Sequence, residues 1–279
     1  MITKTQAKQT TISKEISLKG VGLHTGKDVE IKFLPAIASS GYVFVRKDLE
    51  GAPMIKADAN LVTSTQRGTC LEKNGVSIQT CEHVLAALVG LEIDNVTIEL
   101  NNAEPPIMDG SSKFFVEALE SVGIQKLNAF REAFIVKDVI SYIDEETGSD
   151  ITIIPSDEYQ VTTMVDFGTK VLGTQNATLS KLSNFKSQIS NSRTFSFLHE
   201  LETLLEEGLI KGGDLNNAIV YVDKPLSKST MEKLKKAFNK DSISVKPNGI
   251  LDNLNLHYPN EAARHKLLDV IGDLALVGI

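Results

Sequence analysis

Short segments in which apolar and polar residues alternate place the strongest constraint on the fold of this chain. Residues 28–34 (DVEIKFL) alternate three large apolar residues with charged ones, and residues 42–48 and 94–100 follow similar patterns. A period of two is typical of strands that bury one face. The first third of the chain is therefore expected to be rich in strands.

Two helices are expected within this strand-rich part. Residues 81–90 (CEHVLAALVG) predict a helix that ends at Gly90. Residues 111–123 (SSKFFVEALESVG) form an amphipathic pattern in which a serine can cap the start and Gly123 closes the end.

The strand pattern begins again after a boundary that we expect near residues 126–131. Segments FIVKDVI, ITIIP and YQVTTMVDF predict strands through residue 167. They are followed by a predicted helix around 197–208, a strand at 217–223 and a helix that opens near Asn260. Because strands and long helices do not alternate strictly, the pattern favours an α+β fold over a doubly wound sheet.

Composition narrows the class of protein. The net charge is −7 with no long basic run, which argues against a dedicated nucleic-acid-binding protein. No apolar run is long enough to span a bilayer, and the N-terminus has no apolar stretch typical of a signal peptide. Cys70 and Cys81 lack CxxC spacing and are interpreted as two reduced thiols. We therefore expect a cytoplasmic protein.

The segment EAARHKLLDVIGD (261–273) contains the first candidate metal ligands. In a helix, Asp269 lies about 40° around the axis from His265 and roughly 6 Å along it, so both side chains share a face. Gly272 falls on the same stripe and leaves it uncrowded. An imidazole and a carboxylate so placed can bind one metal ion. Taken alone, the pair is better interpreted as a helical His–Asp hydrogen bond without a metal.

His83 makes a metal site more plausible, because it directly follows Glu82 at the start of the predicted 81–90 helix. A metal-activated water needs ligands that lower its pKa to about 7 and a nearby base that takes its proton. Two histidines and one aspartate leave a coordination position open, as in catalytic zinc sites. The same ligands also fit the facial triad of non-haem iron oxygenases. Glu82 favours a hydrolase, although a surface glutamate beside a core histidine is the simpler alternative.

Two loop segments have both a functional and a structural interpretation. Residues 20–26 (GVGLHTG) are rich in glycine, but they lack the GK[ST] of a P-loop, so a tight connection between two strands is favoured. His24 would then be a turn residue near the site. Asp109, in PPIMDGSS, is better interpreted as a helix cap than as an orienting carboxylate.

The segment SRTFSF (192–197) and the residues after it could contact a substrate. Thr194 could donate a hydrogen bond to a developing anion, and Phe195 could stack on a ring. The leucines that follow form an apolar stripe, for which core packing is the default and a channel for a lipid tail is the alternative. His199 and His257 have no obvious partners and are assigned to the surface.

Five segments occur in the order GVGLHTG, CEHVLAAL, EPPIMDGSS, SRTFSF and RHKLLDVIGD. Together they resemble the motifs of the UDP-3-O-acyl-N-acetylglucosamine deacetylases, the zinc enzymes of lipid A synthesis in Gram-negative bacteria. The resemblance runs over nearly the whole chain. It implies two α+β domains, residues 1–127 and 128–279, each a sheet layered on helices, with the active site at their interface.

The resemblance also implies a role for each candidate residue. The first domain would supply the base and one zinc ligand, and the second would supply the remaining site residues. The implied assignments are the zinc ligands His83, His265 and Asp269, the general base Glu82, the oxyanion donor Thr194, the substrate neighbour Lys266, the orienting carboxylate Asp273, the sugar-nucleotide contact Phe195, and an acyl-chain passage formed by Leu198, Leu201, Leu204, Leu209 and Ile210.

The implied reaction is zinc-dependent hydrolysis of the N-acetyl group of UDP-3-O-(3-hydroxyacyl)-N-acetylglucosamine, which releases acetate in the committed step of lipid A biosynthesis. The family also has a histidine in a glycine-flanked segment beyond the helix of the ligand pair, and the sequence ends at Ile279 before such a segment. We therefore expect a C-terminally truncated piece, related to longer bifunctional chains in which a 3-hydroxyacyl-carrier-protein dehydratase is fused to the deacetylase. The alternatives are a fragment that binds metal or nucleotide-sugar without turnover and, ranked far lower, a 2-His-1-Asp iron oxygenase.

Overall fold

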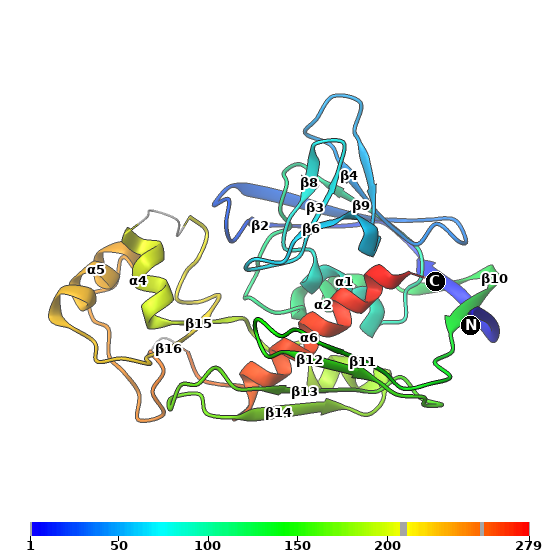
Figure 1. The fold of residues 1–279 in the computed structure, drawn as a ribbon. Coiled ribbons are helices and arrows are strands. Elements are labelled where there is room, and N and C mark those ends of the chain that lie inside the picture. Colours follow the sequence, from blue (N-terminus) through cyan, green and yellow to red (C-terminus); the bar gives the residue numbers. More distant parts are fainter. Residues whose placement is uncertain (1, 207–210, 252–253, 279) are drawn as a thin grey trace.

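The computed structural model describes residues 2–206, 211–251 and 254–278. It is a mixed α+β structure, as the sequence predicts, and Figure 1 shows its central helices between two layers of strands. In the described parts of the chain, no helix is both long enough and apolar enough to cross a membrane.

One layer is a five-stranded sheet with the order β2-β3-β9-β4-β5. Its neighbours pair antiparallel except β4 and β9, which are parallel. A three-stranded sheet, β6-β7-β8, lies between β5 and β9 in the chain. The strands are β2 (Ile16–Val21), β3 (Asp28–Pro35), β4 (Tyr42–Arg46), β5 (Met54–Lys56), β6 (Val62–Ser64), β7 (Cys70–Lys73), β8 (Val76–Ile78) and β9 (Val96–Leu100), with a short helix η1 (Ala59–Leu61) before β6.

The remaining strands form two-stranded pairs. Three of these pairs are antiparallel, and β15–β16 is parallel. The pairs are β1 (Ile2–Ile12) with β10 (Ile124–Phe134), β11 (Ile140–Ile143) with β12 (Asp150–Ile153), β13 (Val161–Val165) with β14 (Gln175–Leu179), and β15 (Phe195–Phe197) with β16 (Ile219–Tyr221). The boundary expected at residues 126–131 lies inside β10, which joins the N-terminal strand, and the division into two domains stays a prediction.

The expected helices are present, with ends that differ by a few residues from the sequence pattern. They are α1 (Glu82–Gly90), α2 (Lys113–Ser121), α3 (Phe185–Gln188), α4 (Leu198–Glu206), α5 (Lys228–Phe238) and α6 (Glu261–Leu274), with short helices η2 (Leu182–Asn184) and η3 (Ala275–Val277). Beyond Glu82 and His83, helix α1 is apolar on all sides, and a helical segment of that kind must be buried on all sides. Its residues from Val84 to Leu88 have no exposed surface, and α6 packs against it (Figure 1).

Candidate metal centre and active-site cleft

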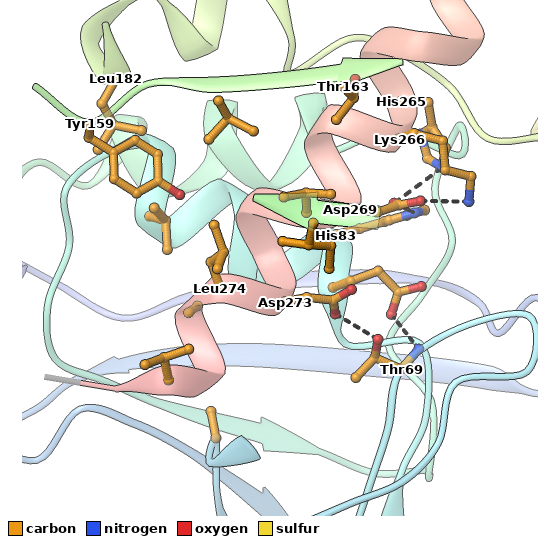
Figure 2. Close-up of a pocket in the computed structure, with 18 of the residues that line it drawn as sticks. Thr69, His83, Tyr159, Thr163, Leu182, His265, Lys266, Asp269, Asp273 and Leu274 are labelled. Atoms are coloured by element: carbon orange, nitrogen blue, oxygen red, sulfur yellow. Dashed lines mark hydrogen bonds and ion pairs between the residues drawn. The ribbon is translucent and has the colours of Figure 1, made fainter. Parts of the chain in front are cut away.

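Three potential metal ligands converge where α1 meets α6, although they are far apart in the sequence. His83 lies in the first turn of α1, and His265 and Asp269 share one face of α6 (Figure 2). Asp269 Oδ1 is 3.5 Å from His83 Nε2 and 3.4 Å from His265 Nε2, and one ligand atom from each residue lies within 4.8 Å of the others. Both imidazoles are buried. The structure therefore brings together the three side chains that the sequence analysis selected.

The close approach of the two helices depends on Gly272. A Cβ atom at this position would lie 2.1 Å from the backbone oxygen of Glu82, so any larger residue would push α6 away from α1. The start of α1 has a second close contact, because the hydroxyl of Ser112 donates a hydrogen bond of 2.7 Å to the backbone oxygen of His83. The glycine predicted to leave the stripe uncrowded thus makes room for the backbone of the neighbouring helix.

The orientation of His265 is fixed by its second ring nitrogen. Nδ1 lies 3.1 Å from the backbone oxygen of Ser192. Burial lowers the pKa of His265 to about 4, so its ring is neutral near pH 7. A carbonyl oxygen only accepts, so Nδ1 must be the protonated nitrogen, and Nε2 presents a lone pair towards Asp269. This is the tautomer that a metal ligand needs.

Asp269 has one satisfied and one unsatisfied oxygen. Oδ2 accepts a hydrogen bond of 3.0 Å from Lys266 Nζ, whereas Oδ1 is buried without a hydrogen-bond partner. Burial by itself would raise the pKa of Asp269, but the positive charge of Lys266 and the close approach of His83 outweigh it and hold the pKa well below its usual range. An ionised, unpartnered oxygen that faces two imidazole nitrogens is a costly arrangement unless a cation completes it. The residues present therefore fit a divalent metal such as zinc.

Glu82 lies beside this cluster and is held by a residue that the sequence analysis missed. The backbone N–H of Thr69 donates to Glu82 Oε2 over 3.0 Å, and the Thr69 hydroxyl donates to Asp273 Oδ1 over 2.6 Å. Burial raises the pKa of Glu82 to about 7, and burial also raises the pKa of Asp273. A carboxyl group poised near neutral pH is suited to general acid–base chemistry. Thr69 lies in the polar segment STQRGTC, which has no motif that could have revealed it.

The site opens into a broad cleft of about 2930 Å³. Lys266, Asp273, Thr194 and Phe195 all line it, as do Glu82 and the three potential ligands. Lys266 Nζ lies 5.7 Å from the centre of the Phe195 ring, and attraction to Asp269 raises the pKa of Lys266, so this cation faces the cleft at neutral pH. The cleft therefore has an apolar ring, a cation and a hydroxyl-bearing residue along one wall.

The leucine stripe after residue 197 divides between core and cleft. Leu198 is fully buried and packs with Leu215, Val220 and Leu234, which is the core alternative. Leu201 belongs to the same cluster but also lines the cleft. Nothing is described of the Leu204 side chain, and Leu209 and Ile210 lie outside the described residues. The acyl-chain passage stays a prediction.

The glycine-rich loop is the tight connection between β2 and β3 that its sequence favours. Its backbone donors are occupied from within the chain, because Glu104 accepts from the N–H groups of His24 (3.1 Å) and Thr25 (2.9 Å) and from the Thr80 hydroxyl (3.1 Å). Glu104 is fully buried, and His24 lines the cleft. An internal carboxylate thus fills the position that a phosphate would take in the alternative interpretation.

The remaining local predictions concern a cap and two histidines. Asp109 accepts from the N–H (3.0 Å) and hydroxyl (2.6 Å) of Ser111, a turn that leads into α2. Asp109 does not cap the helix, because Ser112 occupies the N-cap position of α2 and no side chain forms a capping hydrogen bond there, so the cap interpretation is wrong. His199 and His257 are both exposed, as predicted, and the His199 ring also contacts Asp223 at 2.5 Å.

The family model and the similar proteins found by comparison agree on one family. Residues 9–238 and 229–279 match the model of the family described as UDP-3-O-acyl N-acetylglycosamine deacetylase. The chain is 45% identical over 271 residues to a bifunctional enzyme LpxC/FabZ of Bacteroides thetaiotaomicron, and 44% identical over 274 residues to one of Chlorobaculum tepidum. It is 37% identical over 272 residues to a UDP-3-O-acyl-N-acetylglucosamine deacetylase of Nitratidesulfovibrio vulgaris.

Coverage differs between the two kinds of relative. In all three comparisons the aligned region spans 97% of this chain. It spans 59% of the length of the two bifunctional relatives and 80% of the Nitratidesulfovibrio protein. The similarity therefore concerns one part of each bifunctional protein.

Proposed function

Because the chain belongs to the UDP-3-O-acyl N-acetylglycosamine deacetylase family, we propose that it hydrolyses the N-acetyl group of UDP-3-O-(3-hydroxyacyl)-N-acetylglucosamine and releases acetate. This reaction would contribute to lipid A biosynthesis in the cytoplasm. The observation that carries the proposal is the convergence of His83, His265 and Asp269 beside the Glu82 carboxyl group. Two imidazoles and one carboxylate would hold zinc and leave one position open.

Zinc held by these three residues would polarise the acetamide carbonyl and lower the pKa of a bound water. Glu82 is the residue placed to accept the proton of the attacking water. It lies next to His83 in sequence, lines the cleft, and is fixed through Oε2 by the Thr69 amide. An elevated pKa lets Glu82 take a proton and later return it to the leaving amine.

Other residues of the cleft would bind and orient the substrate. Thr194, just before β15, would donate a hydrogen bond to the oxyanion that develops on the carbonyl. Lys266 would attract the anionic substrate, and Phe195 would offer its ring to the sugar-nucleotide. Asp273 would orient a further catalytic group from its place beside Thr69.

The proposal also includes a contact for the acyl chain and a second module in a longer protein. Leu201, the described member of the leucine stripe that lines the cleft, is the best-supported contact for an acyl chain, with Leu198 packed behind it. The names of the bifunctional relatives suggest that a dehydratase module accompanies this part in a longer protein. These assignments rest on the family and on the position of each residue in the cleft.

The deciding experiment compares Glu82→Gln with the wild type in an acetate-release assay on the acylated UDP-sugar, with metal content measured in parallel. The substitution keeps the shape of the side chain but removes the base, so we expect release to fall by about 10²–10⁴-fold with zinc retained. The matched control is Glu145→Gln, which makes the same chemical change at an exposed turn and should leave release unchanged.

Each failure has a distinct meaning. Full activity in Glu82→Gln would remove the base assignment. Zinc bound without any acetate release in the wild type would favour a protein that binds metal without turnover. Iron in place of zinc, in protein purified without added metal, would favour the oxygenase.

A further inference from the structure

Thr69 is a buried residue that contacts two elements of the site without being a candidate ligand itself. It lies directly before β7 and only 5% of its surface is exposed. Its partners come from both helices that build the metal centre. Figure 2 shows Thr69 and Asp273 facing each other below the potential ligands.

Each polar group of Thr69 has a separate partner. Its N–H donates to Glu82 Oε2 at 3.0 Å, and its hydroxyl donates to Asp273 Oδ1 at 2.6 Å. Its backbone oxygen accepts from the N–H of Cys81, the residue that precedes α1, at 3.4 Å. One residue therefore links the start of α1 to the last turn of α6.

The neighbouring residue keeps the other oxygen of Glu82 accessible. A Cβ atom at Gly68 would lie 3.2 Å from Glu82 Oε1, so a side chain there would crowd this oxygen. With Oε2 bonded to Thr69 and Oε1 uncrowded, Glu82 has one fixed oxygen and one that can receive a proton. The direction of Glu82 thus depends on where the segment 68–69 lies.

We propose that Thr69 is a positioning residue: its hydroxyl fixes this segment on Asp273, and its amide thereby aims Glu82 at the metal site. The inference rests on the proposed function, because it assigns a role to Thr69 in the deacetylation. It gives Asp273 a further use, since this carboxylate anchors the segment that holds the base. Partners of this kind, one step removed from the reacting groups, typically contribute about 10–100-fold to activity.

The first test compares Thr69→Val with Thr69→Ser. Valine keeps the shape and the backbone N–H but removes the hydroxyl, whereas serine keeps the hydroxyl. We expect kcat for acetate release to fall about 10–100-fold in Thr69→Val, with KM and zinc content unchanged, and to recover in Thr69→Ser. Thr63→Val, at an exposed position of β6, is the matched control and should behave as the wild type. Equal activity of the valine and serine variants would overturn the proposal.

A second comparison separates positioning from a general structural role. If Thr69 acts through Glu82, Thr69→Val should have little further effect in a Glu82→Gln background. An equal fold-loss in both backgrounds would indicate a structural role and overturn the inference. Thr69→Ala provides the same comparison if the valine variant does not fold.

A readout without activity tests the contact itself. Thr69→Val and Asp273→Ala should be non-additive in urea unfolding, because each removes one partner of the same hydrogen bond. If the wild type released no acetate, the proposed function would fail, while this unfolding cycle would still be informative. Additive effects in that cycle would overturn the positioning role independently.

Discussion

The contact between α1 and α6 and the hairpin formed by β11 and β12 are both rich in apolar residues, yet they differ in burial. In the helix contact, Leu85, Leu88, Leu267 and Ile271 have no exposed surface. In the hairpin, every residue of both strands is exposed. Within the described residues, each hairpin strand pairs only with the other.

The comparison shows that an apolar sequence alone does not determine whether a segment is buried. Two strands exposed on both faces gain little from burial, and an isolated two-stranded hairpin is marginally stable in water. The helix contact excludes water, so its polar groups interact at short range in a medium of low dielectric. The pKa values of Glu82 and His265 depart from their ordinary range for that reason. We therefore infer that the contact between α1 and α6 is the more stable region and that it holds the site residues in place.

The largest expected effect follows from removing a ligand at the helix contact. Asp269→Ala deletes the carboxylate between the two imidazoles, so zinc affinity should fall by more than the roughly 10–100-fold typical of residues one step removed from the metal. Asp150→Ala in β12 makes the same change at an exposed position and should leave zinc affinity unchanged. Competition with a chromophoric chelator measures both. Retained tight binding in Asp269→Ala would show that the three side chains do not form the metal site.

The next comparison tests burial directly. Leu267 has no exposed surface, so Leu267→Ala should lower the free energy of unfolding by about 2–5 kcal/mol. Ile151 is 63% exposed, and Ile151→Ala should change it by no more than about 0.5 kcal/mol. Urea denaturation followed by circular dichroism gives both values. A large cost for Ile151→Ala would show that another surface covers the hairpin in solution and would break the contrast.

Sequence analysis predicted most of the local elements because their signals are local, but the strand predicted over FIVKDVI is wrong, since residues 135–139 connect β10 to β11. The alternation in residues 28–34 and the helix predicted at residues 81–90 reappear as strand β3 and the buried helix α1. The His265–Asp269 spacing also translates directly into a shared helix face. The convergence of His83 on this pair required the family resemblance, since no local spacing connects residues so far apart.

The residues that sequence analysis missed act through backbone atoms or at a distance. Thr69 holds Glu82 through its amide, which every residue except proline possesses. Glu104 fills the glycine-rich loop from a different segment. Ser112, expected as a helix cap, instead donates its hydroxyl to the backbone oxygen of His83. Such contacts depend on tertiary packing, which neither periodicity nor motif spacing encodes.

The smallest predicted effect is the pH dependence of zinc affinity. It also distinguishes the contact between α1 and α6 from the hairpin. Burial alone would lower the pKa of His83, but the contact of its Nε2 with Asp269 and the charges of Glu82 and Asp269 raise it above the ordinary value. Below that raised pKa, a metal ion must displace a proton from His83 in order to bind. As pH falls below that raised pKa, His83 is protonated and apparent zinc affinity should fall by about tenfold per pH unit for one proton.

Isothermal titration calorimetry between roughly pH 6 and pH 8, in buffers with different ionisation enthalpies, measures both the affinity and the protons released. The hairpin serves as an internal control for this pH dependence. Its turn carboxylate, Asp144, has a pKa lowered by hydrogen bonds from Thr147 and Glu146, so it stays ionised throughout this pH range. A hairpin variant such as Asp150→Ala should therefore show the same pH dependence of zinc binding as the wild type. Zinc affinity that does not change with pH would mean that His83 holds no proton in the metal-free protein, and the charges around it would then act more weakly than their distances indicate.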